Sequence, residues 1–279
     1  TYHTYDEQTG EFLDHTLHCY NCEADFYNFF DTYLSPLMTG VKINHSVAMD
    51  TVTENTHVKI PEIALPEKFI RIDELPPEHA AVKYVLSRNF NPITTGKYWF
   101  VGYCDGGSSF SCRNRLIIPF VMNGKFVGWQ ARALKGESPK YFSARGMRRN
   151  LMLYNYDLAK ECQIGVICEG PLDALRVGPP GMGLMGKTLS DVQVRLLGNA
   201  FHGKPIIILL DSDVAGRGAA KTIYSRLVNS VFSFVENIEL KNGDPASHTG
   251  EEIWNIINSV VVNKFKMKPI NINLCASIV

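Results

Sequence analysis

The apolar positions of the chain follow two different rhythms. Between residues 115 and 134 they alternate around Asn123–Gly124, which predicts a β-hairpin that turns at this dipeptide. From residue 164 onward, short continuous apolar runs alternate with helix-like patterns. This alternation is typical of a parallel sheet flanked by helices. The sequence therefore predicts an α/β fold, preceded by a mixed α+β subdomain.

The expected elements follow one another closely. Paired prolines and an apolar stripe predict a helix over 76–88. Ser190 or Thr188 is suited to be the N-cap of a later helix. We expect strands over 164–170, 181–186, 205–211 and 232–240, and helices over 171–178, 188–198, 215–229 and 250–261. Because ligands of such sheets bind at the carboxyl ends of the strands, the polar residues there are the candidates for chemistry.

Carboxylates gather at those strand ends. Glu169 ends the first strand, Asp211 and Asp213 end the third, and Asp244 follows the fourth. Asp173 lies one helical turn after Glu169. Like charges at one edge repel each other unless a cation lies between them. An oxygen-rich set without histidine or cysteine favours Mg²⁺ or Mn²⁺. The alternative is that each aspartate only caps a strand or a helix.

The formal net charge of zero conceals a local imbalance. Residues 113–149 carry nine basic and one acidic side chain, whereas residues 1–112 carry seven basic and fifteen acidic ones. Such a basic block is a candidate phosphate-binding surface, and the alternative is a solvated basic face.

The sequence also excludes some classes of protein. No apolar run is long enough to cross a bilayer, and no signal peptide opens the chain. The seven cysteines show no spacing typical of a disulfide framework, which favours the cytoplasm. Because the chain starts at Thr1, we expect it to be a fragment.

Three motifs of the second half resemble a known module. They are EGPLDAL at 169–175, DSDVAGRGAA at 211–220 and NGDPA at 242–246. In this order, on alternating strands and helices, they resemble the TOPRIM module of bacterial DnaG-type primases, topoisomerases and some nucleases. The resemblance implies a TOPRIM domain in this half of the chain.

The upstream residues favour the primases among these families. The stretch 113–146 resembles the basic half of the primase catalytic core, and Arg115, Arg132 and Lys140 match its basic positions. Topoisomerases lack this half. The likeness is strongest to primases of T-even-type tailed bacteriophages, which are similar in HCYNC, in the HxxxKYVxxR segment at 79–88 and in EGPLDAL.

This resemblance implies a DNA primase that joins ribonucleotides on a single-stranded DNA template, with a replicative hexameric helicase as partner and no membrane. The carboxylates expected to be catalytic are Glu169, Asp211 and Asp213, which would hold Mg²⁺ or Mn²⁺, with Asp173 and Asp244 in support. The residues expected to bind nucleotide phosphates or DNA are Arg113, Arg115, Arg132, Lys140, Arg145, Arg148 and Arg149. Trp129 and Tyr141 could stack on bases or pack in the core.

Cys19 and Cys22 form a C-x₂-C pair, whose spacing allows both thiolates to share one zinc ion. The resemblance implies that this pair is half of a zinc ribbon, and His3, His15 or His18 could supply further ligands. The alternative is a pair of buried free cysteines.

The expected organisation has five parts, and two other functions stay open. The parts are a partial zinc ribbon at 1–34, a linker at 35–68, a basic subdomain at 69–160, a TOPRIM domain at 161–262 and a tail at 263–279. The alternatives to a primase are a TOPRIM-type nuclease and a catalytically inactive nucleic-acid-binding protein.

Overall fold

The computed structural model describes residues 60–105, 111–230, 232 and 234–271, together with the backbone of two short strands nearer the N-terminus. Contacts divide the chain into two units, Thr1–Ile60 and Pro61–Val279. In the first unit, β1 (Leu17–Cys19) pairs antiparallel with β2 (Ala24–Phe26).

The zinc hypothesis falls on the part of the chain that the structure does not describe. Cys22, His3 and His15 lie outside the described residues, as do the side chains of Cys19 and His18. Most of the expected linker at 35–68 and the end of the expected tail also lie outside them. The domain boundaries therefore stay predictions.

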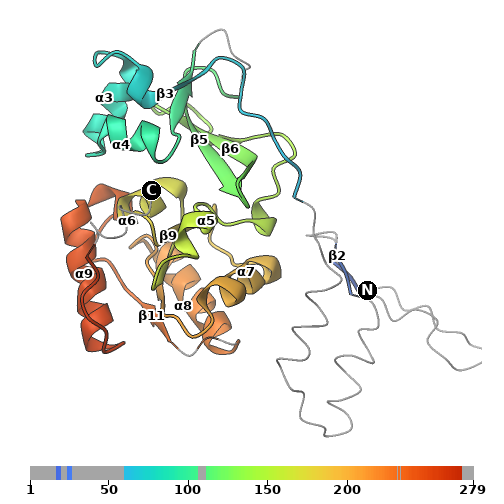
Figure 1. Ribbon diagram of the computed structural model, residues 1–279, viewed down its shortest axis with the longest axis vertical. Helices are drawn as coiled ribbons and strands as arrows, with labels where there is room; N and C mark the ends of the chain where they lie inside the picture. The colour runs from blue at the N-terminus through green and yellow to red at the C-terminus, as the bar shows by residue number, and fades with distance from the viewer. Residues whose placement is uncertain are drawn as a thin grey trace, which may run out of the picture. The chain divides into compact units, whose positions relative to one another are not determined.

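The second unit opens with an antiparallel sheet of order β3-β4-β5-β6-β7 (Figure 1). Its strands are β3 (Phe69–Arg71), β4 (Gly102–Cys104), β5 (Arg115–Met122), β6 (Lys125–Ala133) and β7 (Tyr141–Ser143). The predicted hairpin is confirmed in β5 and β6. Its turn residues Asn123 and Gly124 both have positive φ, of 52° and 72°, which is the backbone that a tight two-residue hairpin turn requires.

Short helices lie between β3 and β4 of this sheet. They are η2 (Ile72–Glu74), α3 (Ala80–Ser87) and α4 (Pro92–Lys97). The helix expected over 76–88 begins later, because His79 is its N-cap and accepts a hydrogen bond from Ala81 N on Nδ1 at 3.1 Å. The sequence did not predict α4, β3, β4 or β7, which are short and have no clear apolar period.

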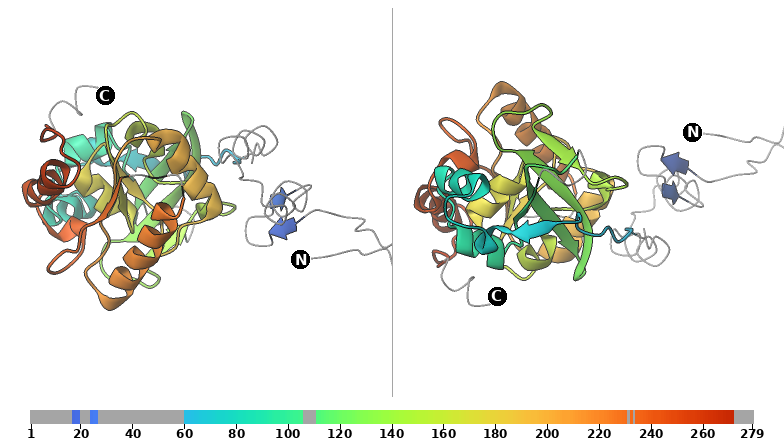
Figure 2. Two further views of the ribbon diagram at one scale, coloured as in Figure 1. Left: turned by 90° about the horizontal axis from the view of Figure 1, so that it is seen from below. Right: turned by 90° about the horizontal axis from the view of Figure 1, so that it is seen from above.

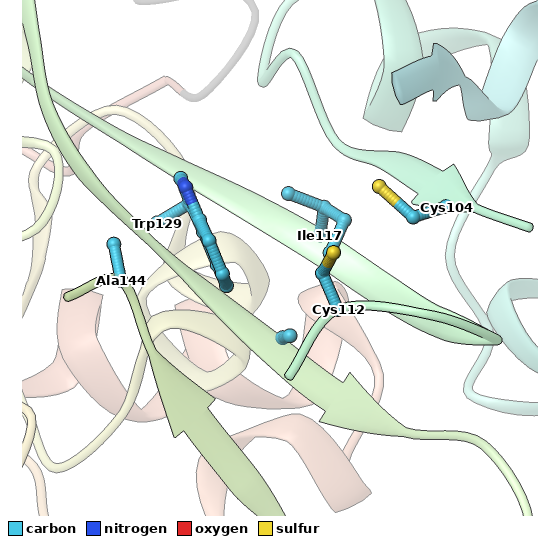
Figure 3. Packing of buried hydrophobic residues seen from close by; sticks show 6 residues of the cluster. Cys104, Cys112, Ile117, Trp129 and Ala144 are labelled. Atoms are coloured by element: carbon cyan, nitrogen blue, oxygen red, sulfur yellow. The ribbon is translucent and has the colours of Figure 1, made fainter. Parts of the chain in front are cut away.

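The core of this sheet is small and closely packed. Trp129 of β6 packs with Ile117, Cys104 and Cys112 and with two alanines (Figure 3). The indole is only 8% exposed. Trp129 is therefore a core residue, the second of the two roles that the sequence allowed for it.

The predicted parallel sheet is confirmed. Its order is β11-β10-β8-β9, and all neighbouring pairs are parallel. The strands are β8 (Gly165–Cys168), β9 (Gly181–Gly183), β10 (Ile206–Ile208) and β11 (Val235–Asn237). The first three are buried along their whole length, as strands covered on both faces are.

Helices surround these strands (Figure 2). The four long ones follow the strands in turn, as α6 (Pro171–Val177), α7 (Asp191–Phe201), α8 (Val214–Val228) and α9 (Gly250–Asn263). Ser190 is the N-cap of α7. Short turns complete the chain as η3 (Arg149–Leu151), α5 (Tyr156–Ala159) and η4 (Pro245–Ser247). In the described part of the chain, no helix combines the length and the apolar character that crossing a membrane requires.

Two sets of hydrogen bonds hold the two sheets of this unit together. The carboxylate of Asp157 in α5 accepts from the backbone N–H groups of Asn123 and Gly124, each at 2.9 Å. Arg176 at the end of α6 donates to the carbonyl oxygens of Arg88 at 2.6 Å and Asn89 at 3.0 Å. These bonds reach the tip of the hairpin and the end of α3, so the antiparallel sheet is fixed over the parallel one.

Candidate functional site

Two of the expected carboxylates lie at the carboxyl ends of adjacent strands. Glu169 follows β8 and Asp211 lies three residues beyond β10, and the parallel pairing of these strands brings their ends to the same edge of the sheet. Both side chains are half-buried. Asp213 lies just beyond, as the N-cap of α8, where its Oδ1 accepts from Gly216 N at 2.5 Å.

The buried setting of Glu169 and Asp211 makes their charges costly. Glu169 Oε2 and Asp211 Oδ1 are buried without a hydrogen-bond partner among the described residues. Burial raises the pKa of Glu169, and the charge of Asp211 raises it further. Burial also raises the pKa of Asp211, to which the charge of Asp244 adds. Because these two oxygens accept no hydrogen bond, a nearby cation would stabilise their negative charges.

Asp173 and Asp244 lie close enough to Asp211 for their charges to interact with it. Asp173 is buried in α6, and its carboxylate accepts from Gly170 N at 3.1 Å and from Ala246 N at 3.2 Å. Burial, then the charges of Asp244 and Asp211, raise the pKa of Asp173 to about 7. Asp173 therefore ties the start of α6 to the segment that carries Asp244.

Asp213 differs because it is exposed. The hydrogen bond from Gly216 N lowers its pKa. A Cβ atom at Gly216 would lie 2.2 Å from the carbonyl oxygen of Asp211, so only glycine lets the start of α8 pack this closely on the strand end. The glycine thus serves the position of Asp211.

A lysine that sequence reasoning missed lies among these carboxylates. Lys187 Nζ lies 3.6 Å from Glu169 Oε2 and 3.5 Å from Asp213 Oδ1. The signal that could have identified it is its position in the loop after β9, because this loop lies at the same edge of the sheet as the carboxylates.

The donor chemistry fits a hard divalent cation such as Mg²⁺ or Mn²⁺, which prefers carboxylate oxygens. In the described ranges, however, no three histidine, cysteine, aspartate or glutamate side chains are grouped closely enough to hold a metal. Without a metal, the positive charge between Glu169 and Asp213 is the Lys187 ammonium.

Arg132 of β6 is the most firmly oriented of the expected phosphate-binding residues. Its Nε donates to the hydroxyl of Tyr84, and its Nη1 donates to the hydroxyl of Tyr141 at 2.5 Å. Its guanidinium also lies over both rings, 5.8 Å and 5.0 Å from their centroids. Tyr141, which the sequence offered as a base-stacking residue, thus holds an arginine. Burial lowers the pKa of Arg132, but the interactions with the two tyrosine hydroxyls outweigh it and raise the pKa overall. This side chain is therefore a fixed cation.

The other expected basic residues divide into an exposed set and a buried one. Lys140 is exposed, and its positive charge partly offsets the rise in the pKa of Asp211 that burial causes. Arg115 is only 6% exposed, and its Nη1 donates to the carbonyl oxygen of Pro139 at 2.8 Å. Arg115 therefore braces the sheet, contrary to its expected role in phosphate binding. Of the rest, Arg148 is half-buried, and the exposed ones are Arg113, Arg145 and Arg149.

Arg88 is a second residue that the sequence did not single out for the site. Its Nη2 lies 3.8 Å from Asp244 Oδ1, and its backbone carbonyl accepts from Arg176. The end of α3 therefore contacts the acidic edge both directly and through Arg176. The signal in the sequence was the HxxxKYVxxR segment, which ends at Arg88.

Part of this chain is similar in sequence to known proteins. Residues 166–246 match the family described as Toprim-like. A DNA primase of Synechococcus elongatus is 32% identical over 122 residues, which are 39% of this chain and 17% of the relative. A DNA primase of enterobacteria phage T4 is 32% identical over 118 residues, 38% of this chain and 34% of the relative. Over these residues, this chain is similar to both DNA primases.

The solved structure of the DnaG primase catalytic domain bound to ssDNA has the same fold. It superposes with a TM-score of 0.58 at 17% identity, over 68% of this chain and 74% of that chain. The Toprim-like segment contains all five candidate carboxylates, and the antiparallel sheet with Arg132 lies before it. The chain spans only about a sixth and a third of the lengths of the two curated primases.

Proposed function

We propose that this chain is the catalytic part of a DNA primase, which joins ribonucleotides on a single-stranded DNA template. The observation that carries the proposal is the close approach of a basic surface to a carboxylate edge. Arg88 Nη2 lies 3.8 Å from Asp244 Oδ1, and the charge of Lys140, in the loop between β6 and β7, acts on Asp211. Arg132 lies in β6 of the same part of the chain. Polyphosphate chemistry needs cations on both sides of the substrate, which this arrangement would supply.

The carboxylates would hold the divalent metal. Glu169, Asp211 and Asp213 would be its ligands, and Asp173 would fix the neighbouring segment through its hydrogen bond from Ala246 N. Bound Mg²⁺ or Mn²⁺ would activate the primer 3′-hydroxyl and neutralise charge on the departing pyrophosphate. Arg132 and Lys140 would orient the nucleotide phosphates, and Arg113, Arg145, Arg148 and Arg149 would extend the track for single-stranded DNA.

Further partners follow from the same proposal. Cys19 and Cys22 would supply half of the ligands of a Zn²⁺ ribbon, and a replicative hexameric helicase would recruit the primase. A protein with this activity would act in the cytoplasm, where template and ribonucleotides are found.

A single assay separates the candidate activities. The protein is incubated with Mg²⁺ or Mn²⁺, labelled ribonucleotides and single-stranded DNA of mixed sequence. Labelled RNA that lengthens with time is the expected result. Shortened template DNA without RNA would indicate a TOPRIM-type nuclease instead. Template binding with neither product would indicate an inactive nucleic-acid-binding protein.

Arg132→Lys should raise the KM for ribonucleotides by about 10- to 100-fold, the range for losing a hydrogen bond to a charged group. Lysine keeps the charge but lacks the planar fork that Tyr84 and Tyr141 orient. Steady-state primer synthesis at varied nucleotide concentration measures this change.

Lys125→Ala is the matched control, because Lys125 lies in the same basic block but pairs with Glu62. It should leave the KM nearly unchanged. A rise of KM in Lys125→Ala without a rise in Arg132→Lys would mean that only the overall charge matters, and that the oriented guanidinium does not.

A further inference from the structure

The loop that carries Lys187 is fixed at both ends. At its start, Leu184 N donates to the carbonyl oxygen of Cys168 at 3.0 Å, and Met185 N donates to that of Glu169 at 2.9 Å. At its end, the Ser190 hydroxyl donates to the carbonyl oxygen of Asn150 at 2.5 Å while capping α7. The loop therefore holds Lys187 at the strand end that bears Glu169.

The side chain of Lys187 joins carboxylates from two different elements. Glu169 follows β8, whereas Asp213 caps α8 after β10. The ammonium lies 3.6 Å from Glu169 Oε2 and 3.5 Å from each carboxylate oxygen of Asp213. These are two of the three residues assigned above to the metal, and Lys187 therefore stands where a bridging cation would be needed.

Lysine is suited to leave such a position. Its charge is a compact ammonium on a flexible four-carbon stem, and its side chain here is 35% exposed. A divalent ion brings twice the charge and binds carboxylate oxygens at about 2.1 Å, much closer than the ammonium approaches. Entry of the metal would thus release the lysine without unfolding the loop, whose anchors are backbone bonds and the Ser190 hydroxyl.

We propose that Lys187 is a positioning residue that bridges Glu169 and Asp213 until a divalent cation enters, and then turns to the phosphates of the incoming nucleotide. The inference rests on the proposed function for the identity of the metal and the nucleotide. In the metal-free protein, Lys187 keeps the repelling carboxylates in place. With metal bound, its ammonium is released beside the substrate.

This arrangement predicts opposite effects on two kinds of binding. Lys187→Met removes a competitor, so Mn²⁺ alone should bind about three- to tenfold more tightly, the scale of losing two exposed ion pairs. With Mn²⁺ saturating, ribonucleoside triphosphate should bind about tenfold more weakly, because one cation that contacts phosphate is lost. A lysine that merely shaped the loop would weaken both kinds of binding together.

The experiment uses the full chain and compares Lys187→Met with Lys221→Met. Lys221 is an exposed lysine of α8, so its variant removes the same charge away from the loop. Mn²⁺ affinity is measured by electron paramagnetic resonance, nucleotide affinity by calorimetry, and melting temperature with chelator and with Mn²⁺. Lys187→Met should melt lower than wild type only in chelator, which also shows that it folds.

The outcomes separate this inference from the primase proposal. Unchanged or weaker Mn²⁺ binding by Lys187→Met, or a lower melting temperature that Mn²⁺ does not restore, overturns the bridging role. If tighter Mn²⁺ binding occurs but wild type makes no primer, the primase proposal fails and the bridging role stands. If nucleotide affinity is unchanged, the turn toward phosphate is wrong.

Discussion

Asp211→Asn should reduce primer synthesis by at least about 10²- to 10³-fold, the range for removing one preorganised electrostatic group from an active site. Asparagine keeps the shape of the side chain but removes the negative charge that would bind the metal. Because burial and Asp244 raise the pKa of Asp211, its charge disfavours the folded state at neutral pH. The variant should therefore also melt at a higher temperature than wild type in metal-free buffer.

This pairing of lost activity with gained stability distinguishes a metal ligand from a structural cap. Glu161→Gln is the control, since Glu161 is exposed and precedes β8, at the opposite edge of the same sheet. It should change neither quantity. Primer synthesis and thermal melting are measured on the same preparations, and an Asp211→Asn variant that synthesises primers normally would remove Asp211 from the metal site.

The free energy of unfolding in metal-free buffer should fall as the pH rises from about 4 to about 7. Burial, followed by the charges of Asp244 and Asp211, raises the pKa of Asp173 from 3.8 to about 7. Between these values the folded state keeps a proton that the unfolded chain has released, so raising the pH favours unfolding. At 1.36 kcal/mol per pKa unit, this group accounts for a loss of roughly 4 kcal/mol, complete above pH 7.

Denaturant unfolding of Asp173→Asn at pH 5 and at pH 8 tests whether Asp173 causes this pH dependence. The single carbonyl oxygen of asparagine can keep only one of the two backbone hydrogen bonds, so the variant should be less stable than wild type at pH 5. At pH 8 the difference should shrink or reverse. Asp157→Asn loses the same kind of bond in α5 and should keep the pH dependence of wild type. An unchanged pH dependence in Asp173→Asn would assign the effect to other groups.

The sequence determined the parallel half of the protein because its signals are local. Each buried strand is a short apolar run, and in a parallel sheet every such run ends at the same edge. The apolar runs alone were therefore enough to assign Glu169 and Asp211 to one site. The hairpin of β5 and β6 was equally predictable, because Asn123 and Gly124 both tolerate positive φ.

Only the tertiary structure decided what the individual side chains do. Arg115 and Arg132 lie on paired strands of one sheet, yet Arg115 is buried against backbone carbonyls while Arg132 is held by Tyr84 and Tyr141. Both arginines belong to the same basic block, so the local charge does not distinguish them. Their difference arises from neighbours far away in sequence, which no local pattern encodes.

Lys187, the positively charged partner of the carboxylates, also shows the difference between what the sequence predicts and what the tertiary structure decides. The sequence predicted that a cation lies near Glu169 and Asp213, because like charges at one edge repel. It did not show that the loop after β9 brings Lys187 to that edge, since the position of this loop depends on strand order and on hydrogen bonds to the end of β8. The need for positive charge is a property of the residues, whereas its source is a property of the fold.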